Sequence, residues 1–309
     1  MVKPLVSVII PCYRQARYLP EAIDSALGQT HQPIQVVVVN DGSPDDTREV
    51  CRRYAGRIVY VEQPNQGRSA ARNAGVAASA GQWLQFLDAD DLLAPRKIEW
   101  QLQDLQQQQA RIGYCCTVYF REGPFTQPNT CQYVGQITDM TAGLASLWLG
   151  TPLPIHCVLM RRDVFDANGG FPRGVEIDED RSFFLTIALT GENFHFTPVI
   201  GAYYRQHSAS TNYSNHIAII MSNFRFLQSV WTLAMEGKLD RQVLRPVIQR
   251  SCFILAHAIV KSGACWSDLK PVLDFSSEFG GPGPRCERLR RVLPSWMVNR
   301  LWAWRQKWL

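Results

Sequence analysis

The sequence predicts an α/β fold in which a doubly wound, mostly parallel sheet is followed by a C-terminal helical extension. In the first 90 residues, short unbroken apolar runs alternate with amphipathic segments. Such runs are typical of parallel strands covered on both faces, and strands that alternate with helices at this spacing build a doubly wound sheet. After about residue 215, apolar residues recur at helical spacing without intervening strands.

Four apolar runs rich in β-branched and aromatic residues are the predicted strands of the first half. They cover residues 6–10, 36–39, 58–61 and 83–87. Helices are expected between them at 19–27 and behind Asp45 and Asp46, where apolar residues recur every four positions. Ligands of a doubly wound sheet lie beyond the carboxyl ends of its strands, so we expect the functional site there.

The second half continues this alternation less regularly. The predicted elements are a helix at 95–109, strands at 112–120 and 157–160, a helix at 181–189 and a strand at 194–204. Residues 121–156 are rich in Pro, Gly and Thr around a short helix near 142–149, which is typical of a variable, substrate-facing insertion. The later helices are predicted at 216–236, 240–262 and 266–278, before a Gly- and Pro-rich linker at 280–284.

These elements divide the chain into three parts. The sheet domain is predicted at 1–214, with an N-terminal half at 1–115 and a second half at 116–214, followed by a helical extension at 215–284 and a tail at 285–309. The composition, with 46% hydrophobic and 19% charged residues, excludes a disordered, collagen-like or coiled-coil chain.

The net charge of +5 is concentrated in the tail. Residues 285–309 hold seven Lys and Arg against Glu287 alone, which leaves the rest of the chain at a net charge of −1. In a helix drawn over 296–309, most basic and most apolar residues lie on opposite sides, Arg305 excepted, and four of the nine Trp are there. This pattern is typical of a helix at an anionic bilayer surface, and packing on protein is the alternative. Nucleic acid is not expected, because the basic residues form no stripe with the acidic sheet edge.

Cysteine usage and targeting signals indicate the compartment. The nine Cys form no CxxC pair and no zinc-type cluster, so we expect buried thiols in a reducing compartment. The apolar run at 5–10 is too short for a signal peptide and stops at Pro11, and no run approaches the length of a membrane-spanning helix. We expect a cytoplasmic protein. If the tail binds lipid, the protein would be peripheral on the inner face of the membrane.

Acidic residues follow two of the predicted strands. Asp41 follows the second strand, and Asp88, Asp90 and Asp91 follow the fourth. Like charges at one sheet edge repel one another unless a cation or hydrogen-bond donors lie between them. A Mg²⁺ or Mn²⁺ ion bound to a nucleotide diphosphate provides that cation, because such ions take one or two carboxylates plus phosphate oxygens. The alternative for the second cluster is capping of the helix that begins near Pro95.

Seven short motifs follow one another between residues 5 and 211. They are the strand at 6–13, Asn-Asp-Gly-Ser at 40–43, Asn-Gln-Gly at 65–67, Ala-Arg-Asn-Ala-Gly at 71–75, Phe-Leu-Asp-Ala-Asp-Asp at 86–91, Glu-Asp at 179–180 and Tyr-Arg-Gln-His-Ser-Ala-Ser at 204–210. In this order and spacing they resemble the family 2 glycosyltransferases with the GT-A fold. The resemblance does not extend beyond about residue 215.

The resemblance implies a binding site for the nucleotide of a sugar donor. In the family, the end of the first strand and the Asp of Asn-Asp-Gly-Ser hold uridine or a similar base, which gives this role to Pro11, Tyr13 and Asp41. A carboxylate accepts a hydrogen bond from an imide N–H, and an aromatic ring can flank a base. Arg72 matches the arginine that faces the diphosphate, and Asp88 the residue that contacts the nucleotide. The alternative for Asp41 is that it is only a turn residue, and the alternative for Arg72 is that it is a solvated helix residue.

The resemblance also implies a divalent metal. Asp90 matches the family's metal carboxylate, and His207 matches the histidine that completes the coordination. Mixed carboxylate and imidazole ligands favour Mn²⁺ slightly over Mg²⁺, and both stay open.

The acceptor hydroxyl needs a base as it attacks the anomeric carbon. Asp180 occupies the family's base position and Glu179 that of its partner. Acidic residues are crowded between 176 and 180, and like charge raises proton affinity. The alternative is that these acids stabilise the N-terminus of the following helix.

Together, these features predict a metal-dependent, inverting glycosyltransferase. It would move a sugar from a nucleoside diphosphate sugar, expected to be UDP-linked, to a hydroxyl of a glycan or lipid-linked acceptor. Two alternatives are a non-catalytic nucleotide-sugar binding or scaffold protein and a nucleotidyltransferase. The nucleotidyltransferase is disfavoured because residues 11–15, after the first strand, contain no glycine for a phosphate loop.

Overall fold

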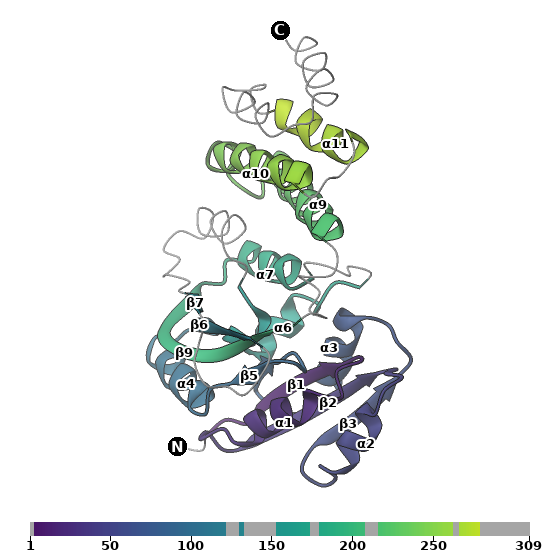
Figure 1. Cartoon of the computed structure of the whole chain (residues 1–309). Helices are drawn as coiled ribbons and strands as arrows, with labels where there is room; N and C mark the ends of the chain where they lie inside the picture. The colour runs from purple at the N-terminus through teal and green to yellow at the C-terminus, as the bar shows by residue number, and fades with distance from the viewer. Residues whose placement is uncertain are drawn as a thin grey trace. The chain divides into compact units, whose positions relative to one another are not determined.

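The computed structural model describes residues 3–121, 130–132, 153–173, 179–207, 216–261 and 266–278 (Figure 1). The described residues up to His207 form one compact unit and those from 216 onward belong to another. The predicted boundary at 214/215 lies between these ranges, outside the described residues.

The first unit is built on one sheet of nine strands with helices around it. Its strands are β1 (Val6–Cys12), β2 (Ile34–Asp41), β3 (Val59–Gln63), β4 (Trp83–Phe86), β5 (Leu92–Leu93), β6 (Ile112–Arg121), β7 (Thr130–Gln132), β8 (Val158–Arg161) and β9 (Phe194–Gln206). Its helices are α1 (Leu19–Leu27), α2 (Thr47–Arg52), α3 (Arg68–Ala77), α4 (Lys97–Gln107), the 3₁₀ turn η1 (Ile155–Cys157), α6 (Arg162–Ala167) and α7 (Glu179–Leu189).

The strand order is β3-β2-β1-β4-β8-β6-β9-β5, with β7 paired to β6. The pairs β3-β2, β2-β1, β1-β4 and β6-β9 are parallel, whereas β8, β5 and β7 pair antiparallel with their neighbours. The predicted fold class, a doubly wound and mostly parallel sheet, is confirmed. The parallel pairs β2-β1 and β1-β4 matter most for the site, because they bring three carboxyl strand ends side by side.

Both faces of the parallel strands are covered. Val8 and Val36 are paired neighbours on β1 and β2, and they belong to a core that also contains α1 and α2. Ile9 and Val39 point the other way, toward α3. A Cβ at Gly75 of α3 would lie 2.4 Å from Cγ2 of Ile9, so only glycine allows this helix to approach the sheet so closely.

Arg162 holds the C-terminal end of α3. Its Nε donates to the carbonyl of Gly81 at 2.7 Å, its Nη1 to the carbonyl of Val76 at 3.2 Å and its Nη2 to Ser79 Oγ at 2.7 Å. The last carbonyls of a helix lack partners within the helix and carry partial negative charge, so a guanidinium is well suited to cap them. The contact joins α3 to α6.

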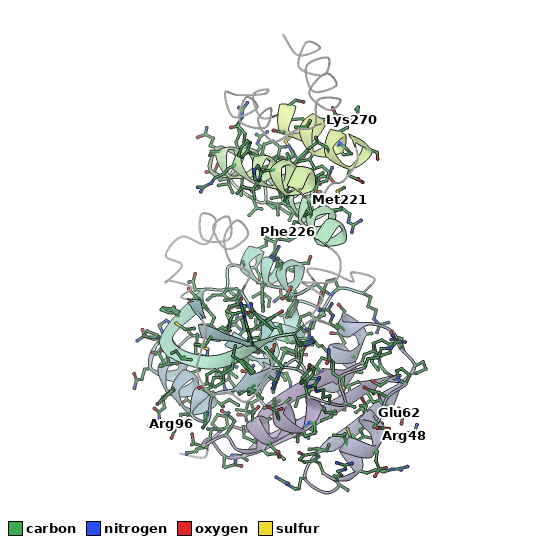
Figure 2. All side chains as sticks on the ribbon, viewed as in Figure 1. Arg48, Glu62, Arg96, Met221, Phe226 and Lys270 are labelled. Atoms are coloured by element: carbon green, nitrogen blue, oxygen red, sulfur yellow. The ribbon has the colours of Figure 1, made fainter. Side chains whose placement is uncertain are left out.

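At the β3 edge of the sheet, Arg48 of α2 is paired with Glu62 of β3, as the labels in Figure 2 show. Both side chains are largely exposed, so this ion pair contributes little to stability.

The second unit contains the helices α9 (His216–Met235), α10 (Arg241–Lys261) and α11 (Trp266–Ser277). α10 packs against both α9 and α11, and the rings of Phe224 and Phe275 meet edge to face with centroids 5.6 Å apart. Across the described residues, every helix is too short or too polar to cross a membrane.

The short elements β5, β7, η1 and α6 were not predicted, and no range was predicted for the helix α3. The short helix predicted near 142–149, the linker at 280–284 and the basic tail at 285–309 lie outside the described residues.

Candidate active site

The carboxyl ends of β2, β1 and β4 lie next to one another, because β1 pairs in parallel with both neighbours. The predicted residues Tyr13, Asp41 and Asp88 follow or end these three strands. The sheet therefore gathers at one edge residues that are up to 75 positions apart in the chain, as the contact between Gln15 Nε2 and Asp90 Oδ2 at 3.4 Å shows.

At the end of β1, Pro11 is buried in the strand opposite Val39, whereas the Tyr13 side chain is 40% exposed. The guanidinium of Arg14 lies over the Tyr13 ring at 5.3 Å. Arg14 has a positive φ of 58°, and its N–H donates to Ser43 Oγ at 3.1 Å, which fixes the bend after β1. The ring of Tyr13 is thus left on the surface at this edge.

The Asp41 carboxylate is buried and accepts three hydrogen bonds from the segment before α3. The donors are Gln63 Nε2 at 2.7 Å, the Gln66 amide at 3.0 Å and the Gly67 amide at 2.9 Å. Asp41 therefore holds the start of α3 in place. Its role in binding a base is a prediction that these contacts leave untested.

Arg72 joins the two halves of the sheet domain. Its side chain is 1% exposed, its Nη2 donates to Asp88 Oδ1 at 2.8 Å, and its Nη1 donates to Glu179 Oε1 at 2.8 Å. The guanidinium also lies 5.1 Å from the centre of the Phe171 ring. Burial opposes the charge of Arg72, but the carboxylates of Asp88 and Glu179 outweigh it and hold the pKa of Arg72 above its ordinary value. Burial likewise raises the pKa of Asp88, but the charges of Arg72 and Arg68 together outweigh this effect, so that the pKa is lowered overall.

The two acids at the start of α7 have different surroundings. Glu179 is 3% exposed and is paired with Arg72, with Nη1 of Arg68 3.7 Å from its Oε1. Asp180 accepts a hydrogen bond from the Arg181 amide at 2.8 Å. Burial, and then the charge of Glu179, raise the pKa of Asp180 to about 6. A carboxylate with a raised pKa is a better proton acceptor, so Asp180 is chemically suited to act as a base.

The fold brings together Asp90 and His207, which are 117 positions apart in the chain. His207 Nε2 lies 2.9 Å from Asp90 Oδ2, and the Tyr18 ring packs on the imidazole with centroids 4.8 Å apart. The His207 side chain is 1% exposed. The imidazole is therefore held in place by packing on one side and by Asp90 on another.

This pair fits a divalent metal. A carboxylate oxygen and an imidazole nitrogen are both ligand types that Mn²⁺ accepts, and Asp90 Oδ2 and His207 Nε2 lie 2.9 Å apart, close enough to contact one ion. Among the described residues there is no group of three His, Cys, Asp or Glu placed for a metal. Asp90 and His207 would hold such an ion, and phosphate oxygens and water would supply the other ligands, as Mg²⁺ and Mn²⁺ sites often do.

Three further residues at the acidic turn were not assigned from the sequence: Asp91, His156 and Arg205. Asp91 Oδ1 accepts a hydrogen bond from the Arg205 amide at 2.8 Å, and His156 Nδ1 lies 2.9 Å from Asp91 Oδ2. Arg205 Nε donates to the carbonyl of Asp90 at 2.8 Å. Burial raises the pKa of Asp91 to about 6, with His156 opposing the rise. Asp91 and Arg205 stand within the motifs quoted above, but His156 carries no sequence signal.

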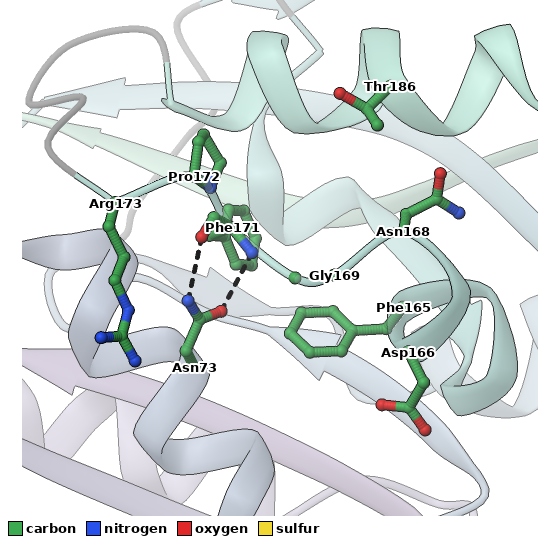
Figure 3. A pocket seen from close by; sticks show the side chains of 10 residues that line it. Asn73, Phe165, Asp166, Asn168, Gly169, Phe171, Pro172, Arg173 and Thr186 are labelled. Atoms are coloured by element: carbon green, nitrogen blue, oxygen red, sulfur yellow. Dashed lines mark hydrogen bonds between the residues drawn. The ribbon is translucent and has the colours of Figure 1, made fainter.

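A pocket of about 610 Å³ is lined by Asn73 of α3, by residues of α6 and the segment that follows it, and by Thr186 of α7 (Figure 3). Asn73 closes one side, accepting from the Phe171 amide at 3.0 Å and donating to the Phe171 carbonyl at 2.9 Å. Among the described residues, those that line the pocket include no predicted site residue. The site is thus defined by the sheet edge and not by this pocket.

Solved structures show the class of fold to which this sheet and its edge belong. Over 96% of this chain and 86% of the other, the structure resembles S. aureus TarS 1–349 in complex with UDP-GlcNAc, with a TM-score of 0.59 at 16% identity. It also resembles the mannosyltransferase PcManGT from Pyrobaculum calidifontis in complex with GDP-Man and Mn²⁺, over 100% of this chain and 85% of the other, with a TM-score of 0.60 at 18% identity. The fold is that of the GT-A glycosyltransferases.

The family follows from the sequence comparison. Residues 7–169, more than half of the chain, match the family model of Glycosyl transferase family 2. The chain belongs to this family, which confirms the resemblance described above.

Curated relatives match over a shorter segment. An uncharacterized glycosyltransferase of Rickettsia prowazekii is 43% identical over 114 residues, which are 36% of each chain. Glycosyltransferase GlyA of Streptococcus pneumoniae is 38% identical over 116 residues, 37% of this chain and 17% of that protein. The aligned segments span about a third or less of these relatives' lengths.

Proposed function

We propose that the protein is a metal-dependent, inverting glycosyltransferase that moves a sugar from a nucleoside diphosphate sugar to a hydroxyl group. The observation that carries the proposal is the pairing of Asp90 with His207 at the sheet edge where the parallel strands end. Such a pair presents one carboxylate and one imidazole to a diphosphate-bound cation. Family membership supports the same class of reaction.

Asp180 is the proposed base. Its carboxylate takes the proton of the acceptor hydroxyl as that oxygen attacks the anomeric carbon and the bond to the diphosphate breaks. Because attack and departure occur on opposite faces of the sugar, the anomeric configuration inverts. A divalent metal, when bound, stabilises the negative charge of the departing diphosphate. Arg72 and Glu179 hold the start of α7 against Asp88, which keeps Asp180 beside the donor half of the domain.

The donor is proposed to be a UDP-sugar, held by Tyr13 and Asp41 at the base and by Asp88 and Arg72 near the diphosphate. Solved structures of the same fold contain UDP-GlcNAc in one case and GDP-Man with Mn²⁺ in another, so both nucleotides belong in a donor screen. The acceptor is proposed to be a glycan or a lipid-linked glycan. Much of the segment expected to contact it, 121–156, lies outside the described residues.

The tail at 285–309 is proposed to place the enzyme on the inner face of a membrane, as a peripheral protein of the cytoplasm. Its seven basic residues and four Trp support this proposal. Liposome pelleting with anionic lipid, at low and high salt, compares the full chain with a chain ending at 284. Undiminished binding by the shorter chain contradicts a role for the tail.

The reaction is tested with the purified full chain, Mn²⁺ and a panel of UDP- and GDP-sugars. Donors are first screened by thermal shift, and release of UDP or GDP is then followed with and without candidate acceptors. Metal-dependent release of nucleoside diphosphate supports the transferase, whereas donor binding without any release favours a binding or scaffold protein. Pyrophosphate-dependent formation of nucleoside triphosphate favours a nucleotidyltransferase. A retained anomeric configuration in the product, determined by NMR, contradicts direct displacement.

A further inference from the structure

A buried histidine lies beside the candidate metal site without belonging to it. His156 is 0% exposed, and its Nδ1 lies 2.9 Å from Asp91 Oδ2. Both ring nitrogens are buried, and neither makes a hydrogen bond of regular geometry among the residues that the structure describes, so the approach of Nδ1 to Asp91 is a close polar contact. A buried nitrogen without a partner is costly, and an apolar side chain at this position would avoid that cost. A histidine at this buried position therefore needs an explanation, and its contact with Asp91 offers one.

Asp91 connects His156 to the strand that leads to a metal ligand. While Oδ2 of Asp91 faces His156, its Oδ1 accepts the amide hydrogen of Arg205 at 2.8 Å. Arg205 in turn donates from Nε to the carbonyl of Asp90 at 2.8 Å. His207 follows Arg205 by two residues, so the end of β9 is bonded to the acidic turn just before the ligand.

The position of His156 is set by the sheet and not by the site. Gln85 of β4 is fully buried, and its Nε2 donates to the carbonyl of His156 at 2.9 Å. β4 runs directly into the turn that contains Asp88 and Asp91. The backbone of His156 is thus held by the strand that leads into the turn with Asp90, which gives the residue a defined place beside Asp91.

We propose that His156 is a positioning residue that acts through Asp91 to set the distance between the metal ligands Asp90 and His207. The inference rests on the proposed function, because it concerns the metal of that reaction. In the described contacts His156 reaches Asp91, and Asp91 holds the amide of Arg205. Residues behind the ligands orient them, and losing such a partner typically weakens metal binding ~10- to 100-fold.

Binding of UDP, measured by isothermal titration calorimetry in Mn²⁺ and in EDTA, tests the inference without requiring turnover. The ratio of the two dissociation constants gives the factor by which the metal tightens nucleotide binding. An Asn side chain places its amide nitrogen near the position of Nδ1, whereas Gln places it near Nε2. We expect H156Q to lower the ratio about 10-fold or more with unchanged affinity in EDTA, and H156N to keep most of it.

His31 provides a matched control. It is also buried, at 4% exposure, and its Nε2 lies 2.9 Å from the carbonyl of Pro4, away from the acidic turn. We expect H31Q to leave the ratio unchanged even where it lowers the melting temperature, because a merely structural role does not change the metal dependence of the folded protein.

Two outcomes overturn the inference: H156Q keeps the wild-type ratio, or H156N loses as much as H156Q. A wild-type ratio near one contradicts the proposed function itself and is recognised before any variant is compared. If circular dichroism finds H156Q unfolded, H156A takes its place against H156N in the same measurement, with the same expected contrast.

Discussion

Asp90 and His207 are 117 positions apart in the chain, yet Asp90 Oδ2 and His207 Nε2 lie 2.9 Å apart. Asp104 and His195 form a second pair of the same chemistry, with 3.0 Å between Oδ2 and Nε2, joining α4 to β9. The two Asp side chains are similarly exposed, at 22% and 25%. The first pair lies at the acidic turn and the second does not, so comparing variants of the two pairs can distinguish the proposed metal binding from structural pairing.

We expect D90N to lower the transfer rate by ~100-fold or more, because the charge that holds the cation against the diphosphate is lost. Mn²⁺ should also cease to tighten UDP binding. D104N should retain both properties, although it removes an Asp from an equivalent contact with a histidine. Equal losses in the two variants, measured by initial rates and calorimetry, would mean that Asp90 acts only through stability.

Replacing Asp180 by Asn should lower transfer by ~10²- to 10⁴-fold, the usual contribution of a general base, and leave UDP binding intact. Initial rates and calorimetry measure the two effects. Normal turnover in D180N would place the base elsewhere.

The pH dependence of transfer follows from the same residue. Burial raises the pKa of Asp180 to about 6, and only the ionised form accepts a proton. The rate should therefore rise with pH up to about 6 and then level off. A profile of kcat/KM that is flat between pH 5 and 7 would contradict the assignment.

The raised pKa also predicts that D180N is more stable than the wild type at pH 7. The folded state binds this proton more tightly than the unfolded state, so ionisation of Asp180 opposes folding as the pH rises from about 4 to above 6. Asn removes that opposition, for an expected gain of ~1–3 kcal/mol in the free energy of unfolding. Urea denaturation should find the gain at pH 7 and little of it near pH 4. The exposed Asp166, changed to Asn, serves as the control and should produce no such difference.

Arg72 should be far more important for stability than its neighbour Arg68. R72M removes the cation paired with Asp88 and leaves the buried Glu179 with the longer contact to Arg68, for a loss of ~3–5 kcal/mol in the free energy of unfolding. Arg68 is 44% exposed with a longer contact to Glu179, so R68M should cost about 1 kcal/mol or less. R72K should recover only part of the loss, because one ammonium group does not reproduce the two-sided geometry of the guanidinium. Similar denaturation midpoints for R72M and R68M would refute this ranking.

Tyr13 tests where the nucleotide base binds. A ring that stacks on a base contributes ~1–3 kcal/mol, so Y13L should weaken UDP binding by about 5-fold or more. Y13F keeps the ring and should bind nearly as well as the wild type. If Y13L binds UDP with wild-type affinity, the base lies away from the end of β1.

Periodic segments were predictable from the sequence, and short elements were not. The helices predicted at 216–236, 240–262 and 266–278 agree with α9, α10 and α11 to within one residue at each end. Their length makes the 3.6-residue period visible. β5 consists of Leu92 and Leu93 alone, and two residues that pair with β9 carry no period of their own.

The candidate site was predictable only where its residues belong to motifs. Asp90 and His207 were assigned from their motifs, but no spacing indicated that Arg72 bonds to Glu179, 107 positions away. Nor did the sequence indicate that three donors from 63–67 converge on Asp41. His156 stands in an ordinary apolar segment just before β8, and its contact with Asp91, 65 positions away, is a long-range one that local pattern does not encode.

Because arginine stays protonated throughout the accessible pH range, the positive charge that Arg72 places between Asp88 and Glu179 is permanent. This part of the site has its own counter-ion before any donor arrives. The resting protein should accordingly tolerate chelators without unfolding.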